Sequence, residues 1–155
     1  LIMLLLGAPL LTGCGFHLRG AYNAAPLQMN VLEISPFSPE DRFQQKLVQL
    51  LNAHEVKIQK GAKCLFEYHT FQETSPVAYG RNGELVREKI KLTLVYTLKK
   101  DGNILLEREV WAERHHHLNM NYELATAQER DMIVKDMQAD VLKQLMLQLR
   151  TVSFS

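Results

Sequence analysis

The sequence has few cysteines, few prolines and a single tryptophan, and its charges nearly cancel. Of its 155 residues two are cysteine and five are proline, and the formal net charge is +1. This composition disfavours a disulfide-rich scaffold, a proline-rich disordered chain and a strongly basic protein. Zinc-finger spacings and basic tracts with interleaved aromatics are also missing, so we expect no nucleic-acid partner. The 46% hydrophobic fraction is typical of a folded domain with a buried core.

Long hydrophobic runs are scarce too, and the clearest one stands at the start of the chain. Residues 1–11 are almost entirely apolar, yet the run is too short to cross a bilayer, which needs about 20 residues. Its length suits the core of a signal peptide. The Met and basic residues that normally precede such a core are missing. We therefore expect residues 1–13 to be a removed signal peptide that is truncated at its N-terminus in this sequence.

The residues that close this run predict the type of signal. Leu11-Thr12-Gly13-Cys14 has the pattern of a bacterial lipobox, in which small residues admit the peptidase and the Cys14 thiol accepts a diacylglyceryl group. With its new amino group also acylated, Cys14 would carry enough chains, palmitate among them, for stable anchoring. Gly15 resembles the non-acidic residue that permits sorting to the outer membrane in Gram-negative lipoproteins. The alternative is an uncleaved apolar segment that happens to end in cysteine.

The mature chain is predicted to hold a tether, residues 14–28, and one domain, residues 29–155. Tight hairpin turns are indicated by Arg81-Asn82-Gly83 and Asp101-Gly102. The order β-α-β-β-β-α predicts an α+β two-layer sandwich, in which two helices cover one face of a four-stranded mixed sheet. The predicted elements are strands at 29–34, 64–74, 85–99 and 104–114, a helix capped by Ser38 with Pro39 at its first position, a short extended stretch at 56–58, and a helix from a Thr126–Glu129 capping box to about Leu149.

Apolar residues alternate with polar ones most regularly in residues 85–99. That alternation predicts one buried face and one wet face. In the last helix apolar residues recur at helical spacing, which predicts one buried stripe. The inward positions are Ile90, Leu92, Leu94, Tyr96 and Leu98 in the strand, and Ile133, Met137, Val141, Leu142, Leu145 and Leu149 in the helix.

Residues that suggest catalysis or metal binding have simpler explanations. Cys64 has no partner for an internal disulfide if Cys14 is lipidated, and we expect it to be buried and inert. In the run His115-His116-His117, consecutive residues of a strand point to opposite faces, so at most His115 and His117 could share one ion. A closed zinc site would still need two further ligands. No hydrolase, P-loop or dinucleotide motif is present. We therefore expect no enzyme, no metal and no cofactor.

Two further groups of charged residues allow more than one interpretation. Glu107 and Glu109 lie about 7 Å apart on one strand face, a spacing that would suit a glycosidase, although such pairs are more often solvated. Arg81, Arg87, Lys89 and Lys91 make a basic patch around the second hairpin. Guanidinium and ammonium groups there would hold the phosphates of an anionic ligand. An equally good interpretation is that they serve solubility and strand register.

Three strings in the sequence resemble the LptE family of lipopolysaccharide-assembly lipoproteins. They are Cys-Gly-Phe-His-Leu-Arg at residues 14–19, the Arg81-Asn82-Gly83 turn, and Asp-Met-Ile-Val-Lys-Asp-Met at residues 131–137. The resemblance covers nearly the whole mature chain in the same order of elements. The first and last strings are specific in combination, whereas the turn alone is common.

The resemblance implies a non-enzymatic plug inside the β-barrel of a partner, LptD, that assists barrel assembly and binds lipopolysaccharide. It also implies an outer-membrane location, lipid-anchored on the periplasmic side. Arg81 matches one basic position that the family uses for lipopolysaccharide. Where relatives have a second, a Lys, this chain has Thr126, and Arg130 or Lys135 would compensate. The competing class is a free-standing periplasmic lipoprotein, either an envelope binding module or a small cell-wall enzyme.

Overall fold

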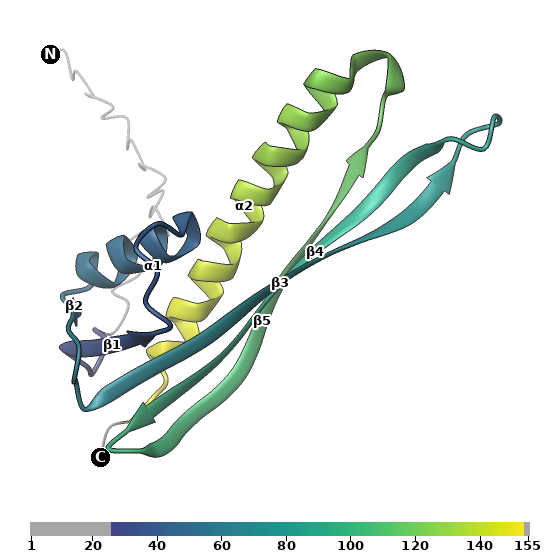
Figure 1. The fold of residues 1–155 in the computed structure, drawn as a ribbon. Helices are drawn as coiled ribbons and strands as arrows, with labels where there is room; N and C mark the ends of the chain where they lie inside the picture. The colour runs from purple at the N-terminus through teal and green to yellow at the C-terminus, as the bar shows by residue number, and fades with distance from the viewer. Residues whose placement is uncertain (1–25, 154–155) are drawn as a thin grey trace, which may run out of the picture.

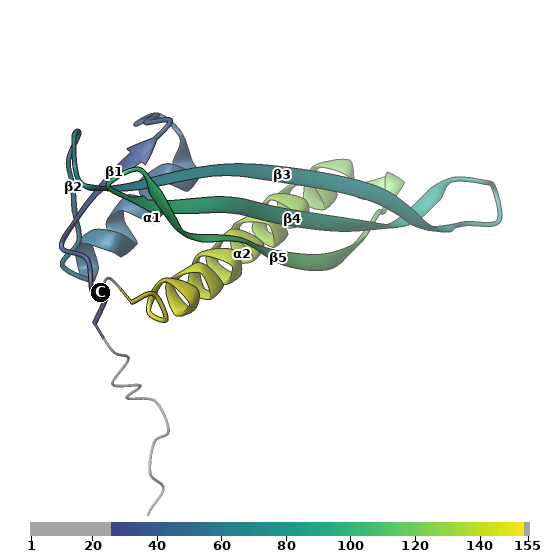
Figure 2. The ribbon, with the colours of Figure 1, turned by 90° about the horizontal axis from the view of Figure 1, so that it is seen from below.

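The computed structural model describes residues 26–153, so the signal peptide, Cys14 and nearly all of the predicted tether lie outside the described residues. One open sheet carries both long helices on the same face (Figures 1 and 2). Its strand order is β2-β1-β3-β4-β5. The elements are β1 (Val31–Ser35), α1 (Arg42–Ala53), β2 (Lys57–Ile58), β3 (Cys64–Tyr79), β4 (Leu85–Lys100), β5 (Asn103–His117), the 3₁₀ turn η1 (Met120–Tyr122) and α2 (Glu123–Leu149).

The predicted α+β class and the order of the main elements are confirmed, but the strand count of four is wrong. The short stretch before Gly61 forms β2, which pairs in parallel with β1 through Val31 opposite Lys57 and Leu32 opposite Ile58. β1 also pairs in parallel with β3, and the rest of the sheet is an antiparallel meander. Two residues are too few to show a period, so only their pairing with β1 identifies them as a strand.

The core lies between the sheet and the helices at one end of the long strands. The predicted inward residues of β4 from Ile90 to Leu98 are all buried, and α1 adds Phe43, Leu47 and Leu51. Aromatic rings join the layers: Phe43 of α1 packs against Tyr68 of β3 with ring centroids 5.8 Å apart. Of the predicted α2 stripe, the buried members are Met137, Val141, Leu142, Leu145 and Leu149, while Ile133 is half-buried.

Both predicted helix starts are wrong. α1 is capped by Asp41, whose Oδ1 accepts a hydrogen bond from the Phe43 amide at 2.9 Å, because Ser38 is too far from the first turn to serve. α2 begins at Glu123, without a side-chain cap. Thr126 therefore lies inside the helix, where its hydroxyl donates to the Asn119 carbonyl at 3.3 Å. A capping-box pattern in the sequence does not show whether the preceding turn is already helical.

Cys64 is buried at the start of β3, as predicted, and is a free thiol. Burial raises the pKa of this thiol, and the nearby positive charge of Lys100 only partly opposes the shift. A raised pKa keeps the group as the unreactive thiol rather than the thiolate.

Among residues 26–153, no helix combines the length and the hydropathy needed to cross a membrane.

Candidate functional site

The hairpin of β3 and β4 runs well beyond the packed part of the molecule (Figures 1 and 2). β5 ends at His117, which pairs with Arg87, and the Leu118 amide makes a last bond to the Val86 carbonyl at 3.0 Å. Beyond that point residues 77–86 form a two-stranded projection, here called the arm. The strand prediction ended at residue 74, and the true strand continues to Tyr79. Residues 75–79, Ser-Pro-Val-Ala-Tyr, show no regular alternation of polar and apolar residues, because the arm has no buried face to impose it.

Local contacts close the arm in a tight turn that presents Arg81. The Gly80 amide donates to the Glu84 carbonyl at 2.8 Å, and Gly83 takes a φ of +78°, a value that favours glycine. A Cβ on Gly80 would lie 3.2 Å from side-chain atoms of Glu84 and Val86, so a larger residue would crowd the turn. Arg81 is exposed at the tip. The predicted hairpin turn is confirmed at this position.

A group of polar side chains lies at the base of the arm, on the face of the sheet that carries the helices. Glu88 of β4 and His116 of β5 are opposite each other in register and are 8% and 1% exposed. Oε1 of Glu88 lies 3.0 Å from Nδ1 of His116 and accepts a bond from Nε of Arg130 at 3.2 Å. Nη2 of Arg130 donates to the Thr74 hydroxyl at 3.0 Å. This arm-base cluster of Thr74, Glu88, His116 and Arg130 thus joins three strands to α2.

The charges of the cluster depend on one another. A buried carboxylate is costly unless it is paired, and Glu88 has two nitrogen partners. Facing a carboxylate, Nδ1 of His116 is the ring nitrogen that donates. Nε2 of His116 is buried, has no hydrogen-bond partner among residues 26–153, and lies 4.0 Å from a carboxylate oxygen of Glu129. Losing Arg130 would leave Glu88 with the imidazole alone.

The three cations predicted to bind lipopolysaccharide occupy three different settings. Arg81 is at the tip of the arm, and Arg130 is in the arm-base cluster. Lys135 is exposed on α2, and five residues of helix place it about 140° around the axis from Arg130. The structure therefore does not gather these three side chains around one ligand.

The rest of the predicted basic patch lies on the opposite face of the sheet. Lys89 pairs with Glu113 at 3.5 Å, and the ammonium of Lys91 lies 5.4 Å from the centre of the Trp111 ring. These lysines alternate with Glu88 and Ile90 along β4, so they point away from the helices. Sequence reasoning missed Glu88, His116 and Thr74. The signal for Glu88 was its position: it is a charged residue in the inward phase of the alternation.

The sequence features that suggested metal binding or catalysis are dispersed. His115 and His117 are exposed on the face opposite buried His116, and Glu107 and Glu109 are exposed on the same face as His115 and His117. Over residues 26–153, no three His, Cys, Asp or Glu side chains are placed to hold one metal ion.

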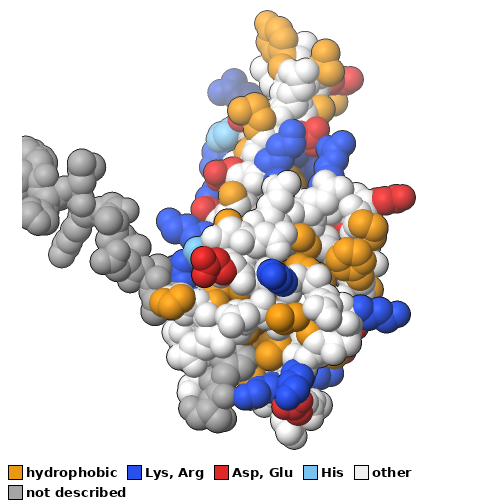
Figure 3. Space-filling view, turned by 90° about the vertical axis from the view of Figure 1, so that its left-hand side faces the viewer, with side chains coloured by type: hydrophobic (Ala, Val, Ile, Leu, Met, Phe, Trp, Pro, Cys, Tyr) orange, Lys and Arg blue, Asp and Glu red, His pale blue; other side chains and the backbone are white. Residues whose placement is uncertain are grey.

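Exposed apolar side chains gather where α2 begins, the end of the helix at the top of Figure 1, and Figure 3 shows hydrophobic side chains at the same end of the molecule. Met120, Tyr122, Leu124 and Met132 are 64–75% exposed. On the arm, Tyr79 is 63% exposed. Near the arm the molecule is thus apolar and open, in contrast to its packed opposite end.

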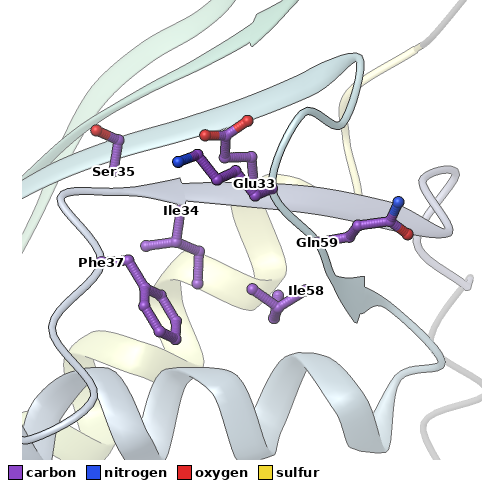
Figure 4. Close-up of a pocket in the computed structure, with 7 residues that line it drawn as sticks. Glu33, Ile34, Ser35, Phe37, Ile58 and Gln59 are labelled. Atoms are coloured by element: carbon purple, nitrogen blue, oxygen red, sulfur yellow. The ribbon is translucent and has the colours of Figure 1, made fainter.

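A separate cavity of about 490 Å³ lies at the other end of the sheet, between β1 and β2 (Figure 4). Ile34, Phe37 and Ile58 extend toward α1, while Glu33 and Ser35 lie on the other side of β1. The Glu33 carboxylate already accepts a bond from the Gly61 amide at 2.7 Å. The polar groups that line this cavity do not point toward one common ligand position, so the arm and its base are the better candidate site.

Solved lipoprotein structures share this fold. Uncharacterized lipoprotein B from Nitrosomonas europaea is 22% identical with a TM-score of 0.70, and the alignment covers 88% of this chain and 90% of that one. Rare lipoprotein B from Shewanella oneidensis is 19% identical, with a TM-score of 0.65 and coverage of 76% and 93%. A minor lipoprotein from Acinetobacter baumannii is 16% identical, with a TM-score of 0.66 and coverage of 81% and 93%.

A family model covers almost all of the described domain. Residues 29–149 match the model described as LptE, lipopolysaccharide-assembly. The matched region runs from the residues just before β1 to the last residue of α2, and so includes the arm and the arm-base cluster. The resemblance noted in the sequence is thereby confirmed, and this chain belongs to the LptE family of lipopolysaccharide-assembly proteins.

Proposed function

We propose that this protein is a non-enzymatic lipoprotein, anchored at the outer membrane through Cys14, that plugs an LptD-like barrel and binds lipopolysaccharide with its arm. The observation that carries the proposal is the family match over residues 29–149. The predicted acylation of Cys14 supports the proposed location, because an acylated N-terminus would hold the domain at the membrane surface.

The surface chemistry suits a plug. A barrel lumen is polar, so a domain enclosed there needs polar outer faces. On the sheet face opposite the helices, Lys99 pairs with Glu67 at 2.5 Å and Lys89 with Glu113 at 3.5 Å. Across the described residues no helix covers this face. This uncovered face therefore combines ion pairs with the exposed rings of Phe71 and Trp111, and it remains available for contact with a barrel wall.

The arm supplies the proposed contact with lipopolysaccharide. Arg81 is exposed at its tip, and a guanidinium binds phosphate through paired hydrogen bonds. Exposed apolar side chains such as Tyr79 on the arm and Leu124 at the start of α2 lie in the same end of the molecule. A ligand with phosphates and acyl chains matches that combination.

The decisive experiment is a pull-down of the detergent-solubilised lipoprotein from its own outer membrane, followed by mass spectrometry. We expect a large LptD-type barrel to co-purify, and Cys14→Ala to lose palmitate labelling. Recovery of a free monomer without a barrel would reject the plug. Hydrolase activity on cell-wall substrates in that free monomer would instead favour the alternative of a small periplasmic enzyme.

A further inference from the structure

We propose that Arg130 is a positioning residue, which holds the base of the arm to α2 through Glu88 and Thr74 and so fixes where Arg81 meets its ligand. The ligand in this statement rests on the proposed function. The role of Arg130 in holding the base of the arm does not rest on the proposed function, because that role belongs to the protein without any ligand.

The arm needs an external support. A two-stranded hairpin without a packed face is marginally stable in water. Within the described part of the chain, no third strand pairs with residues 77–86 beyond the Leu118 to Val86 bond. Val77 and Tyr79 are 42% and 63% exposed, so apolar burial adds little there.

Arg130 contacts both strands of the hairpin just before the arm begins. Its Nε reaches Glu88 of β4 and its Nη2 reaches Thr74 of β3. The register of the two strands shifts between Pro76 and Ala78, immediately beyond these contacts. Such a bulge bends and twists a strand. The two bonds therefore fix the strands on the body side of the bend from which the arm projects.

The geometry favours positioning over direct contact with a ligand. The guanidinium is planar and its N–H groups point in fixed directions. Two of its three nitrogens already donate to protein groups, and Glu88 is 8% exposed and depends on one of them. The Arg130 side chain is 36% exposed, but the Glu88 carboxylate is nearly buried, so removing Arg130 would leave a buried charge without its arginine partner. A phosphate that drew Arg130 away from Glu88 would leave that carboxylate without its arginine partner. Arg81, in contrast, makes no side-chain hydrogen bond or ion pair with any other residue among residues 26–153, so it is available to bind a ligand.

The first test measures amide hydrogen exchange on the whole protein without any ligand. We expect Arg130→Gln to speed exchange across residues 77–86 by at least about tenfold, with no change around Tyr96 in the body. Lys135→Gln is the matched control, since it removes an exposed cation from the same helix. Glu88→Gln, which keeps shape but removes charge, should act like Arg130→Gln and covers the case in which the latter folds poorly. Unchanged arm exchange in both variants overturns the proposal.

The second test separates positioning from contact by labelled-lipopolysaccharide binding. Thr74→Val removes a partner of Arg130 and leaves the arginine and its charge in place, and Thr74→Ser restores the hydroxyl. We expect Thr74→Val to weaken binding several-fold and Thr74→Ser to restore it. Binding that falls with Arg130→Gln but not with Thr74→Val would mean that Arg130 touches the ligand, against the proposal. If the wild-type protein binds no lipopolysaccharide, the proposed function fails, and the exchange test still decides whether Arg130 holds the arm.

Discussion

The two halves of α2 pack in different ways, although they belong to one continuous helix. From Met137 to Leu149 the helix buries six side chains in the core. In residues 123–136 no side chain is buried, and Leu124 is 75% exposed. The C-terminal half is thus held by apolar burial. The N-terminal half contacts the sheet through half-buried Ile133 and Val134 at the edge of the core, through Arg130, and through the ion pair of Arg114 with Asp136.

The same contrast separates the body of the sheet from the arm. In the body, β4 places alternate apolar residues against both helices. At the arm the alternation ends at Glu88, and polar contacts replace packing. Because polar contacts at a surface contribute less net stability than apolar burial, the end of the molecule that carries Arg81 should be the easier one to open locally.

Matched leucine substitutions in α2 test this contrast with the largest expected effect. Leu145 is fully buried and Leu124 is 75% exposed. We expect Leu145→Ala to lower the free energy of unfolding by about 2–5 kcal/mol, and Leu124→Ala to change it by less than about 0.5 kcal/mol. Urea denaturation followed by circular dichroism measures both. Equal losses would show that α2 is packed uniformly.

The pH dependence of stability should reflect the body rather than the arm. Burial raises the pKa of Tyr96 to about 12, with Arg108 opposing the shift, against about 10 in an unfolded chain. Since the folded state favours the neutral phenol, this stabilisation is complete below pH 10 and is lost as the pH rises from 10 to 12.

The loss from Tyr96 should reach about 3 kcal/mol, since the pKa shift is about two units and each unit corresponds to about 1.36 kcal/mol. Tyr96→Phe should flatten the fall in stability above pH 10, measured as urea midpoints at a series of pH values. It should also cost some stability below pH 10, where the neutral phenol donates a hydrogen bond to Gln148. Tyr79→Phe on the arm is the control, and its stability should decrease above pH 10 as much as that of the wild-type protein. A slope that is unaffected by Tyr96→Phe would reject the assignment.

Two glycines in the same backbone conformation compare arm and body directly. Gly61, in the loop before β3, and Gly83, in the arm, both have a φ of +78°, and an added Cβ would meet no described atom within 4 Å at either position. Alanine in this conformation costs about 1 kcal/mol or more. We expect Gly61→Ala to lower global stability by about that amount.

Gly83→Ala should instead leave the global urea midpoint unchanged and speed amide exchange only within residues 77–86. Such a result would show that the arm opens independently of the body. A fall in the global midpoint equal to that of Gly61→Ala would show that arm and body unfold together.

The smallest effect on stability is expected at the tip of the arm. Arg81 is exposed, so Arg81→Asp should change the free energy of unfolding by less than about 0.5 kcal/mol. Lipopolysaccharide binding should nevertheless weaken by about tenfold or more, the value of one charge-assisted hydrogen bond. Arg81→Lys should retain part of the binding, and Lys63→Asp, a charge reversal on the body, should retain all of it. Full binding by Arg81→Asp would remove Arg81 from the site.

The sequence predicts the structure correctly where the burial or the backbone conformation of a residue is set by its neighbours along the chain. The inward set of β4, the buried Cys64 and the turn at Gly83 were all predicted, because period-two alternation and positive φ are local properties. β2 and the outer part of β3 were missed. A two-residue strand has no period, and an arm without a buried face has no alternation to detect.

The sequence alone determined the family, the α+β class and the inward faces of β4 and α2, because motifs and hydrophobic periods are local properties of the sequence. Only the tertiary structure decided that Arg130 meets Glu88 and Thr74 while Lys135 does not. These side chains come from α2, β4 and β3, and their meeting depends on how the helix lies across the sheet. No local pattern encodes that crossing, since it results from the packing of the distant core residues that anchor α2.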